Sequence, residues 1–355
     1  MKRRTFVGTT GVVLLAGCAT QPTTETPTAD PTPTSTERPT TTPDGTDTPT
    51  TEPTETPEPT DTPDDAAAAL ERAQTALVAT VEAFLAVSDR DDPDFGTDVA
   101  GDATDFDPKP ALEELTTAEA AIAEAERLAT GEQTQTVETL RLTARFLGDT
   151  VALQPQHVRL YTRVREMERL FYREGGLSRT QDRVRALRND VDDLEPAHER
   201  LRRQLRNLDS ERMQRVRAVS YQQLERRVGL YEGEREAAAI VRERFRRMVT
   251  AQRAFEEGQN TYAGGNQFGR AESRFGSART DFTSAAGYQS NFEAPPSFRP
   301  VLRRSTCYCE TMAQAALQFR EAATARQNGN DGEADRRRDR ARRAVDDLSE
   351  CNLRG

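Results

Sequence analysis

The chain has 355 residues, with 59 acidic and 49 basic side chains and a formal net charge of −10. Only Lys2 and Lys109 are lysine, tryptophan is absent, and there are two histidines. This composition disfavours a nucleic-acid-binding domain, which is typically basic, and a histidine-rich metal site.

The chain opens with a basic start followed by a short apolar run. The run from Phe6 to Gly17 is interrupted by glycine and threonine, whereas a bilayer-spanning helix needs about 20 predominantly apolar residues. A basic start, a short apolar run and small residues before a processing point are typical of a secretory signal. We therefore expect residues 1–17 to be a removable signal peptide rather than a membrane span.

Two short motifs indicate which kind of signal this is. Adjacent Arg3 and Arg4, followed by Thr5 and Phe6, resemble the twin-arginine signal, which routes folded proteins through the Tat translocase. The flanking residues depart from the usual pattern at Lys2, Val7 and Gly8. The sequence Leu15, Ala16, Gly17, Cys18 resembles a lipobox. This resemblance implies that a diacylglyceryl group on the Cys18 thiol anchors the mature chain to the outer face of the cytoplasmic membrane.

A stalk of extreme composition follows the lipobox. Residues 19–65 carry 11 acids and 1 base and consist mostly of Thr, Pro, Glu and Asp. Such a segment cannot bury enough apolar surface to offset chain entropy, so residues 18–65 are predicted to be disordered and extended. A Thr/Pro-rich tract beside an anchor is typical of an O-glycosylated stalk. A linker without sugars fits as well.

The N-terminal motifs and the composition together resemble one class of protein. The Tat-like start, the lipobox, the acidic Thr/Pro stalk and the replacement of lysine by arginine are similar to surface lipoproteins of halophilic archaea. The resemblance covers the first 65 or so residues and the composition. It implies export and anchoring at the cell surface, and it implies no particular activity.

After Ala66 the apolar residues recur at helical spacing, which predicts an all-α fold. The first part of the body, residues 66–155, contains three such stripes, which are typical of antiparallel helices joined by short turns. They begin at Leu70, Leu112 and Val137. An Asp-rich loop from Asp89 to Pro110 separates the first two stripes. Its spacing does not fit an EF-hand, so a solvated acidic loop is favoured over a cation site.

Residues 156–255 contain the longest helical patterns. One apolar seam alternates steps of three and four residues, which indicates burial against another helix as in a coiled coil. It comprises Val184, Leu187, Val191, Leu194, His198, Leu201, Leu205 and Leu208. Ser178 with Gln181 predicts a capping box at its start, and Pro196 predicts a kink or a restart. A second pattern ends at Phe255, so an antiparallel hairpin is expected, with a single kinked rod as the alternative.

The same region is the basic part of the chain. Residues 156–250 hold 16 acids and 23 bases, a balance that fits either an anionic partner or an ion-paired helix surface. Because the arginines alternate with Glu and Asp at helical spacings, the pattern favours ion-paired helices. We therefore expect no nucleic-acid partner.

Residues 256–355 are predicted to form helical hairpins. One helix pair resembles a tetratricopeptide-type pair in its spacing of large and small residues, and this resemblance implies a peptide-binding surface. The residues that carry this resemblance are Phe255, Tyr262, Ala271, Phe275 and Ala278. Because no second copy follows at the expected period, an ordinary pair of core helices is favoured over a peptide-binding pair.

Three cysteines remain in the body. Cys307 and Cys309 stand near the start of a predicted helix, and Cys351 stands at the end of the next one. The turn between the helices centres near residue 330, so an antiparallel hairpin brings Cys351 opposite the other two. An exported protein can keep a disulfide, and we predict one between Cys351 and either Cys309 or Cys307. A Cys-X-Cys pair with one distant cysteine and no nearby histidine is a poor metal pattern.

The sequence offers no catalytic signature. Only His157 and His198 supply imidazoles, and His198 lies on the apolar seam, where a packed or register-setting role is expected. No GxSxG, HExxH, P-loop or dinucleotide motif occurs, so no cofactor or metal is predicted. We expect a non-catalytic, stalked helical protein that binds or scaffolds other envelope proteins. The alternatives are an accessory ligand-binding subunit of a transport or sensory complex, and a hydrolase with an unrecognised site.

Overall fold

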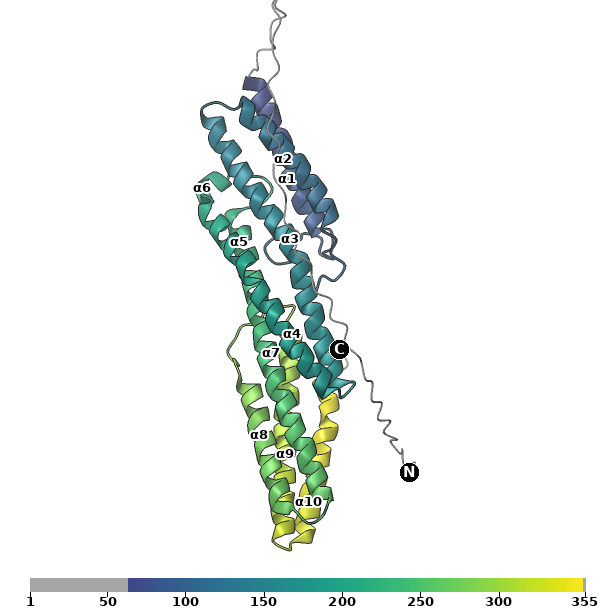
Figure 1. The fold of residues 1–355 in the computed structure, drawn as a ribbon. Coiled ribbons are helices and arrows are strands. Elements are labelled where there is room, and N and C mark those ends of the chain that lie inside the picture. Colours follow the sequence, from purple (N-terminus) through teal and green to yellow (C-terminus); the bar gives the residue numbers. More distant parts are fainter. Residues whose placement is uncertain (1–62, 354–355) are drawn as a thin grey trace, which may run out of the picture. The chain divides into compact units, whose positions relative to one another are not determined.

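The computed structural model describes residues 63–353, and every regular element in that range is a helix (Figure 1). The all-α class predicted from the sequence is confirmed. The signal residues, Cys18 and the stalk up to residue 62 lie outside the described range. Within that range, no helix has the length and apolar character needed to cross a bilayer.

In chain order the helices are α1 (Pro63–Leu85), α2 (Lys109–Leu128), α3 (Glu132–Tyr172), α4 (Leu177–Asp193), α5 (Glu195–Asn207), α6 (Ser210–Met213), α7 (Tyr221–Ala263), α8 (Phe268–Gly287), α9 (Arg299–Gln327) and α10 (Asp331–Asp346), followed by a 3₁₀ turn, η1 (Asp347–Cys351).

Helices α1 and α2 lie side by side and pack on α3 (Figure 1). Their facing surfaces are rich in alanine, which allows close approach of the two backbones. The buried alanines are Ala66, Ala69, Ala73 and Ala76 in α1 and Ala111, Ala118, Ala121 and Ala125 in α2. Larger side chains such as Leu77 and Phe84 extend this surface into the core.

The predicted hairpin is present, formed by α4 and α5 against α7. Its contacts establish an antiparallel register. Arg253 donates to Gln181 near one end (2.8 Å), and Arg202 pairs with Glu232 near the other (2.9 Å). Pro196 restarts the helix as expected, because α4 ends at Asp193 and α5 begins with this proline in its first turn.

The start of α4 corrects one prediction. Gly176 is the N-cap of α4, no side chain caps the helix, and Ser178 lies inside it. Gln181 accepts from Arg253 instead of closing a capping box. Gly175, with φ of 59°, ends the preceding turn, and this left-handed backbone sets the start of α4 two residues earlier than the predicted cap. A complete capping box occurs at Ser220 and Gln223, at the start of α7.

Three of the expected segment boundaries fall inside helices. The stalk was expected to extend to residue 65, but α1 already begins at Pro63. Helix α3 runs continuously through residues 155 and 156, with Pro155 inside it, and α7 runs through residues 255 and 256. The reason is that the apolar pattern does not stop at either point. His157, Leu160 and Val164 continue the buried face of α3.

The C-terminal helices form a second group, in which α8, α9 and α10 lie beside the C-terminal part of α7 (Figure 1). The helix pair that resembles a tetratricopeptide unit comprises the end of α7 and α8. Phe255 and Phe275 both contact Phe319 of α9, with ring centroids 5.5 and 5.1 Å apart. Ala271 and Ala278 are also buried, and Tyr262 is half-buried. Most of these side chains thus belong to the core between α7, α8 and α9, where they are not available to a peptide.

Gly258 lets α7 and α8 approach. A Cβ at this position would lie 2.8 Å from the Phe275 ring, which is fully buried. Gly229, in the same helix, is exposed and has open space around it. Each glycine replaced by alanine gains about 1 kcal/mol of helix propensity, but only Gly258→Ala also overpacks the core, at a cost of about 1–3 kcal/mol.

We therefore expect Gly258→Ala to be less stable than Gly229→Ala by about 1–3 kcal/mol in urea unfolding. The comparison cancels the propensity gain that the two variants share. Equal stability of the two variants would mean that α7 and α8 do not touch at Gly258.

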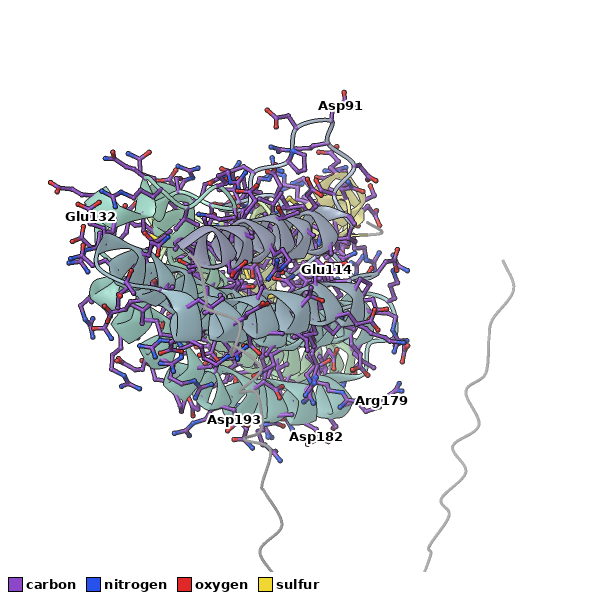
Figure 2. All side chains as sticks on the ribbon, turned by 90° about the horizontal axis from the view of Figure 1, so that it is seen from above. Asp91, Glu114, Glu132, Arg179, Asp182 and Asp193 are labelled. Atoms are coloured by element: carbon purple, nitrogen blue, oxygen red, sulfur yellow. A yellow bond between two sulfur atoms is a disulfide. The ribbon has the colours of Figure 1, made fainter. Side chains whose placement is uncertain are left out.

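The described surface is strongly hydrophilic. Figure 2 shows charged side chains projecting from the helices and the Asp-rich loop, among them Asp91, Glu132 and Asp182. Among the described residues, Leu112 is the one large apolar side chain that is exposed, at 40%. Many arginines pair with carboxylates on the same or a neighbouring helix, as Arg163 does with Asp190 (2.8 Å) and Arg183 with Glu166 (2.9 Å). This pairing agrees with the ion-paired surface expected for the basic region.

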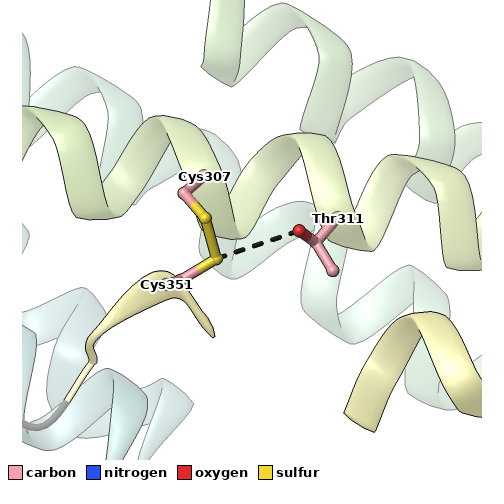
Figure 3. The surroundings of a disulfide bond; sticks show 3 residues. All are labelled: Cys307, Thr311 and Cys351. Atoms are coloured by element: carbon pink, nitrogen blue, oxygen red, sulfur yellow. Dashed lines mark hydrogen bonds between the residues drawn. A yellow bond between two sulfur atoms is a disulfide. The ribbon is translucent and has the colours of Figure 1, made fainter. Parts of the chain in front are cut away.

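A disulfide joins α9 to the end of η1 (Figure 3). It links Cys307 to Cys351, one of the two pairings that the sequence left open, with Cα atoms 5.6 Å apart. Thr311 lies one turn further along α9, its hydroxyl 3.8 Å from the Cys351 sulfur. Cys309 keeps a free, buried thiol. Burial raises its pKa to about 12, so it stays protonated and unreactive near neutral pH.

Candidate functional site

The most unusual feature of the interior is a buried cluster of titratable side chains. Nδ1 of His157 (α3) lies 2.9 Å from Oε2 of Glu234 (α7), and both side chains are 0% exposed. On the other side of its ring, Nε2 of His157 lies 3.0 Å from Nε2 of His198 (α5). Tyr231 stacks on His157, with ring centroids 4.3 Å apart. Three helices therefore meet at one carboxylate and two imidazoles.

Glu234 also binds two connecting segments. Its Oε1 accepts from the backbone N–H of Gly101 (2.7 Å), in the Asp-rich loop, and from the hydroxyl of Ser297 (2.7 Å), in the segment before α9. Burial alone would raise the pKa of this carboxyl group, but the hydrogen bonds from His157, Gly101 and Ser297 outweigh burial and lower it. Glu234 is therefore ionised in the folded chain, with its charge met by fixed donors.

The hydrogen-bond roles of the two imidazoles follow from this charge. An ionised carboxylate only accepts, so Nδ1 of His157 carries a hydrogen and donates to Glu234. Burial, together with the nearby His157, Arg235 and Arg202, lowers the pKa of His198 to about 3. His198 is thus neutral near pH 7 and shares a single hydrogen bond with His157. Its Nδ1 has no partner among the described residues.

A second part of the network holds the Asp-rich loop by its backbone. Gln154 (α3) donates to the carbonyl of Ala100 (2.7 Å) and accepts from the hydroxyl of Tyr231 (3.0 Å). Arg227, which is fully buried, donates to the carbonyls of Phe95 and Val99. Its guanidinium also lies 5.0 Å from the centroid of the Phe84 ring, in a cation–π contact.

Two carboxylates of the Asp-rich loop, those of Asp94 and Asp98, are engaged with protein groups. Asp94 accepts from the backbone of Gly96 and pairs with Arg226 (2.9 Å). Burial acts to raise its pKa, but these hydrogen bonds and the Arg226 charge lower it overall. Asp98 pairs with Arg90 (2.8 Å). Within residues 63–353, no group of three or more His, Cys, Asp or Glu side chains is placed to hold a metal ion.

A carboxylate–imidazole pair is also the arrangement of a general base, which needs access to a substrate. Here both groups are enclosed and face each other at 2.9 Å, and the other oxygen of Glu234 accepts from Gly101 and Ser297. The surface hollows found among the described residues are lined by other side chains. The geometry therefore fits a structural network that ties three helices to two connecting segments.

The sequence located part of this cluster. His198 is packed on the seam, as expected, and is 1% exposed. Glu234, Tyr231 and Arg227 were missed, although one signal was present. Glu234 follows Tyr231 by three residues and precedes Ala238 by four, so it occupies a core position of the α7 pattern. A charged residue at such a position needs a buried partner.

Comparisons with known proteins return no match. No family model matches the chain, and no curated protein or solved structure resembles it significantly. Any assignment of function therefore depends on this chain's own residues.

The network makes stability depend on pH in a defined direction. The histidine pKa in an unfolded chain is about 6.5, whereas that of His198 in the folded chain is about 3. Between these values the unfolded chain binds the extra proton. Stability should therefore fall as the pH drops below about 6.5, by up to about 1.4 kcal/mol per pH unit for this group.

His198→Gln removes the titrating group, so the variant should lose less stability than the wild type between pH 7 and pH 5. Urea unfolding across this range measures the effect, above the pH at which most carboxylates titrate. If wild type and variant show the same slope, His198 is not held neutral by its surroundings.

Proposed function

We propose that this chain is an exported, lipid-anchored protein whose helical body binds or scaffolds other proteins of the cell envelope. The signal-like start and Cys18 specify export and anchoring, and the stalk sets the body away from the membrane. The observation that carries the proposal beyond the sequence motifs is the disulfide between Cys307 and Cys351, because disulfides persist mainly outside the reducing cytoplasm.

The character of the body supports a binding role. The Glu–His network is buried and holds helices and connecting segments together, so a partner cannot reach it. A partner would therefore contact the exposed helix surfaces. These surfaces are charged and nearly free of large apolar side chains within the described residues. A partner would therefore dock mainly through polar and ionic contacts, as in non-obligate complexes, rather than through an apolar face of the obligate type.

One observation favours the second candidate, an accessory ligand-binding subunit of an envelope transport or sensory complex. Two adjoining hollows of about 520 and 660 Å³ lie beside α9, and ligand pockets typically have volumes of this order. Their walls are more polar than is usual for a small-molecule site, with several arginines and two glutamates.

Anchoring is tested by Cys18→Ser in the full chain, with Cys309→Ala as a matched cysteine substitution that leaves the lipobox intact. In the wild type and in Cys309→Ala, the mature N-terminal peptide should carry the mass of a diacylglyceryl group, and the protein should sediment with membranes. Cys18→Ser should lack that mass and appear in the soluble fraction. An unmodified wild-type Cys18 would contradict the anchor.

Affinity purification of the membrane-anchored wild type, followed by identification of co-purifying proteins, tests the binding role. We expect specific envelope proteins that dissociate as the salt concentration rises, because the available surface is ionic. Recovery of no specific protein would contradict the scaffold role.

A further inference from the structure

A groove runs between α8, α9 and residues 288–298, which join them. It consists of the two hollows of about 520 and 660 Å³, which share Arg244, Ser290, Thr306 and Glu310 in their walls and are therefore continuous. Cys307 also lines the groove, so the disulfide lies in its wall.

The innermost charge in the groove is a cation without a carboxylate partner. Arg244 is 3% exposed. Its guanidinium donates to the carbonyls of Tyr288 (2.9 Å) and Leu302 (3.2 Å) and to the hydroxyl of Thr306 (2.8 Å). All of these acceptors are neutral, and the only acceptor recorded for Nη2, which carries two N–H groups, is Tyr288. Buried charges are normally paired, but the positive charge of Arg244 is not neutralised by the described residues and is available to an anionic ligand.

The rim adds to this positive charge. Three exposed arginines line the groove and form no ion pair with a described carboxylate, although Arg299 donates to the carbonyl of Ala294 (3.3 Å). They are Arg279, Arg299 and Arg303. Two glutamates, Glu293 and Glu310, also line it. Four arginines against two glutamates leave a net charge of +2 in a chain whose net charge is −10.

The arginines are spread along the groove rather than gathered at one point. Residues of α9 from Arg299 to Gln314 line it, a rise of about 22 Å at 1.5 Å per residue. An extended peptide spans that length with about seven residues. A single small anion would contact the arginines at only one end of the groove. A peptide with carboxylates on alternate residues would contact arginines along its whole length.

From this charge and length we infer that the groove between α8 and α9 binds an acidic, extended peptide segment of a partner protein. The inference rests on the proposed binding role and specifies the chemistry of the partner. Arg244 forms the floor of the site, Arg279 and Arg303 contact carboxylates from its two ends, and Glu310 repels them and limits the affinity.

Fluorescence anisotropy with the purified full chain tests this directly. The probe is a labelled eight-residue peptide that alternates Glu and Ser, and the comparison peptide has Gln in place of Glu. The acidic peptide should bind more tightly, and added salt should weaken its binding. Equal binding of the Gln peptide would overturn the inference.

Charge variants locate the site. Arg279→Gln and Arg303→Gln should each weaken binding by about two- to fivefold, as expected for exposed ionic contacts. Glu310→Gln should strengthen it by a similar factor, a gain that damage to the fold would not produce. Arg340→Gln, an exposed arginine of α10 outside the groove, should have no effect. If it weakens binding as much as Arg303→Gln, the attraction is diffuse and the groove is not the site.

The two proposals fail separately. If envelope proteins co-purify with wild type and with Arg303→Gln alike, the binding role stands and the groove is not where they dock. If the acidic peptide binds in the groove but no envelope protein co-purifies, the groove site stands and the scaffold role fails.

Discussion

The ionised carboxylate of Glu234 is the interaction on which the arrangement of the described chain depends. It accepts from His157, Gly101 and Ser297, and through His157 it reaches His198. These residues come from α3, α5, α7 and two connecting segments that are far apart in sequence. A buried charge is tolerated only if its surroundings supply donors. All of these segments must therefore be in place together, which makes their assembly cooperative.

The same requirement explains the Asp-rich loop. The sequence favours a solvated loop over a cation site, yet the structure fastens the loop's backbone to the core through Gly101, Ala100 and Phe95. The partners, Glu234, Gln154 and Arg227, lie on α3 and α7. Their role is invisible in a local pattern because it arises from helices that meet only in the fold.

The sequence predicted the helical architecture well because its information is local and periodic. The spacing of apolar residues located the helices, Pro196 located a break, and the hairpin centred near residue 330 brought Cys351 to the Cys307 end. Prediction was weaker where a tertiary contact decides the outcome. The capping box predicted at Ser178 does not form, because the backbone at Gly175 and Gly176 starts α4 two residues earlier. Phe255 and Phe275, which carry the resemblance to a peptide-binding helix pair, instead pack against Phe319 of α9. The Arg244 groove also needs three separate segments to form.

Charged residues have different roles in the interior and on the surface of the described chain. The interior uses its charged residues to fix the helices, and the surface keeps arginines and carboxylates for solvent and partners. The disulfide between Cys307 and Cys351 belongs to both, because it ties η1 to α9 and because Cys307 lines the groove between α8 and α9.

The free energy of unfolding of Glu234→Gln, compared with that of Glu236→Gln, tests most directly whether the buried carboxylate holds the fold together. The two positions are two residues apart on α7, and Glu236 is exposed. Loss of a charged acceptor from a buried network should cost Glu234→Gln about 2–4 kcal/mol in urea unfolding at pH 7. Glu236→Gln should stay within about 0.5 kcal/mol of the wild type. If Glu234→Gln is as stable as Glu236→Gln, the buried carboxylate does not hold the fold together.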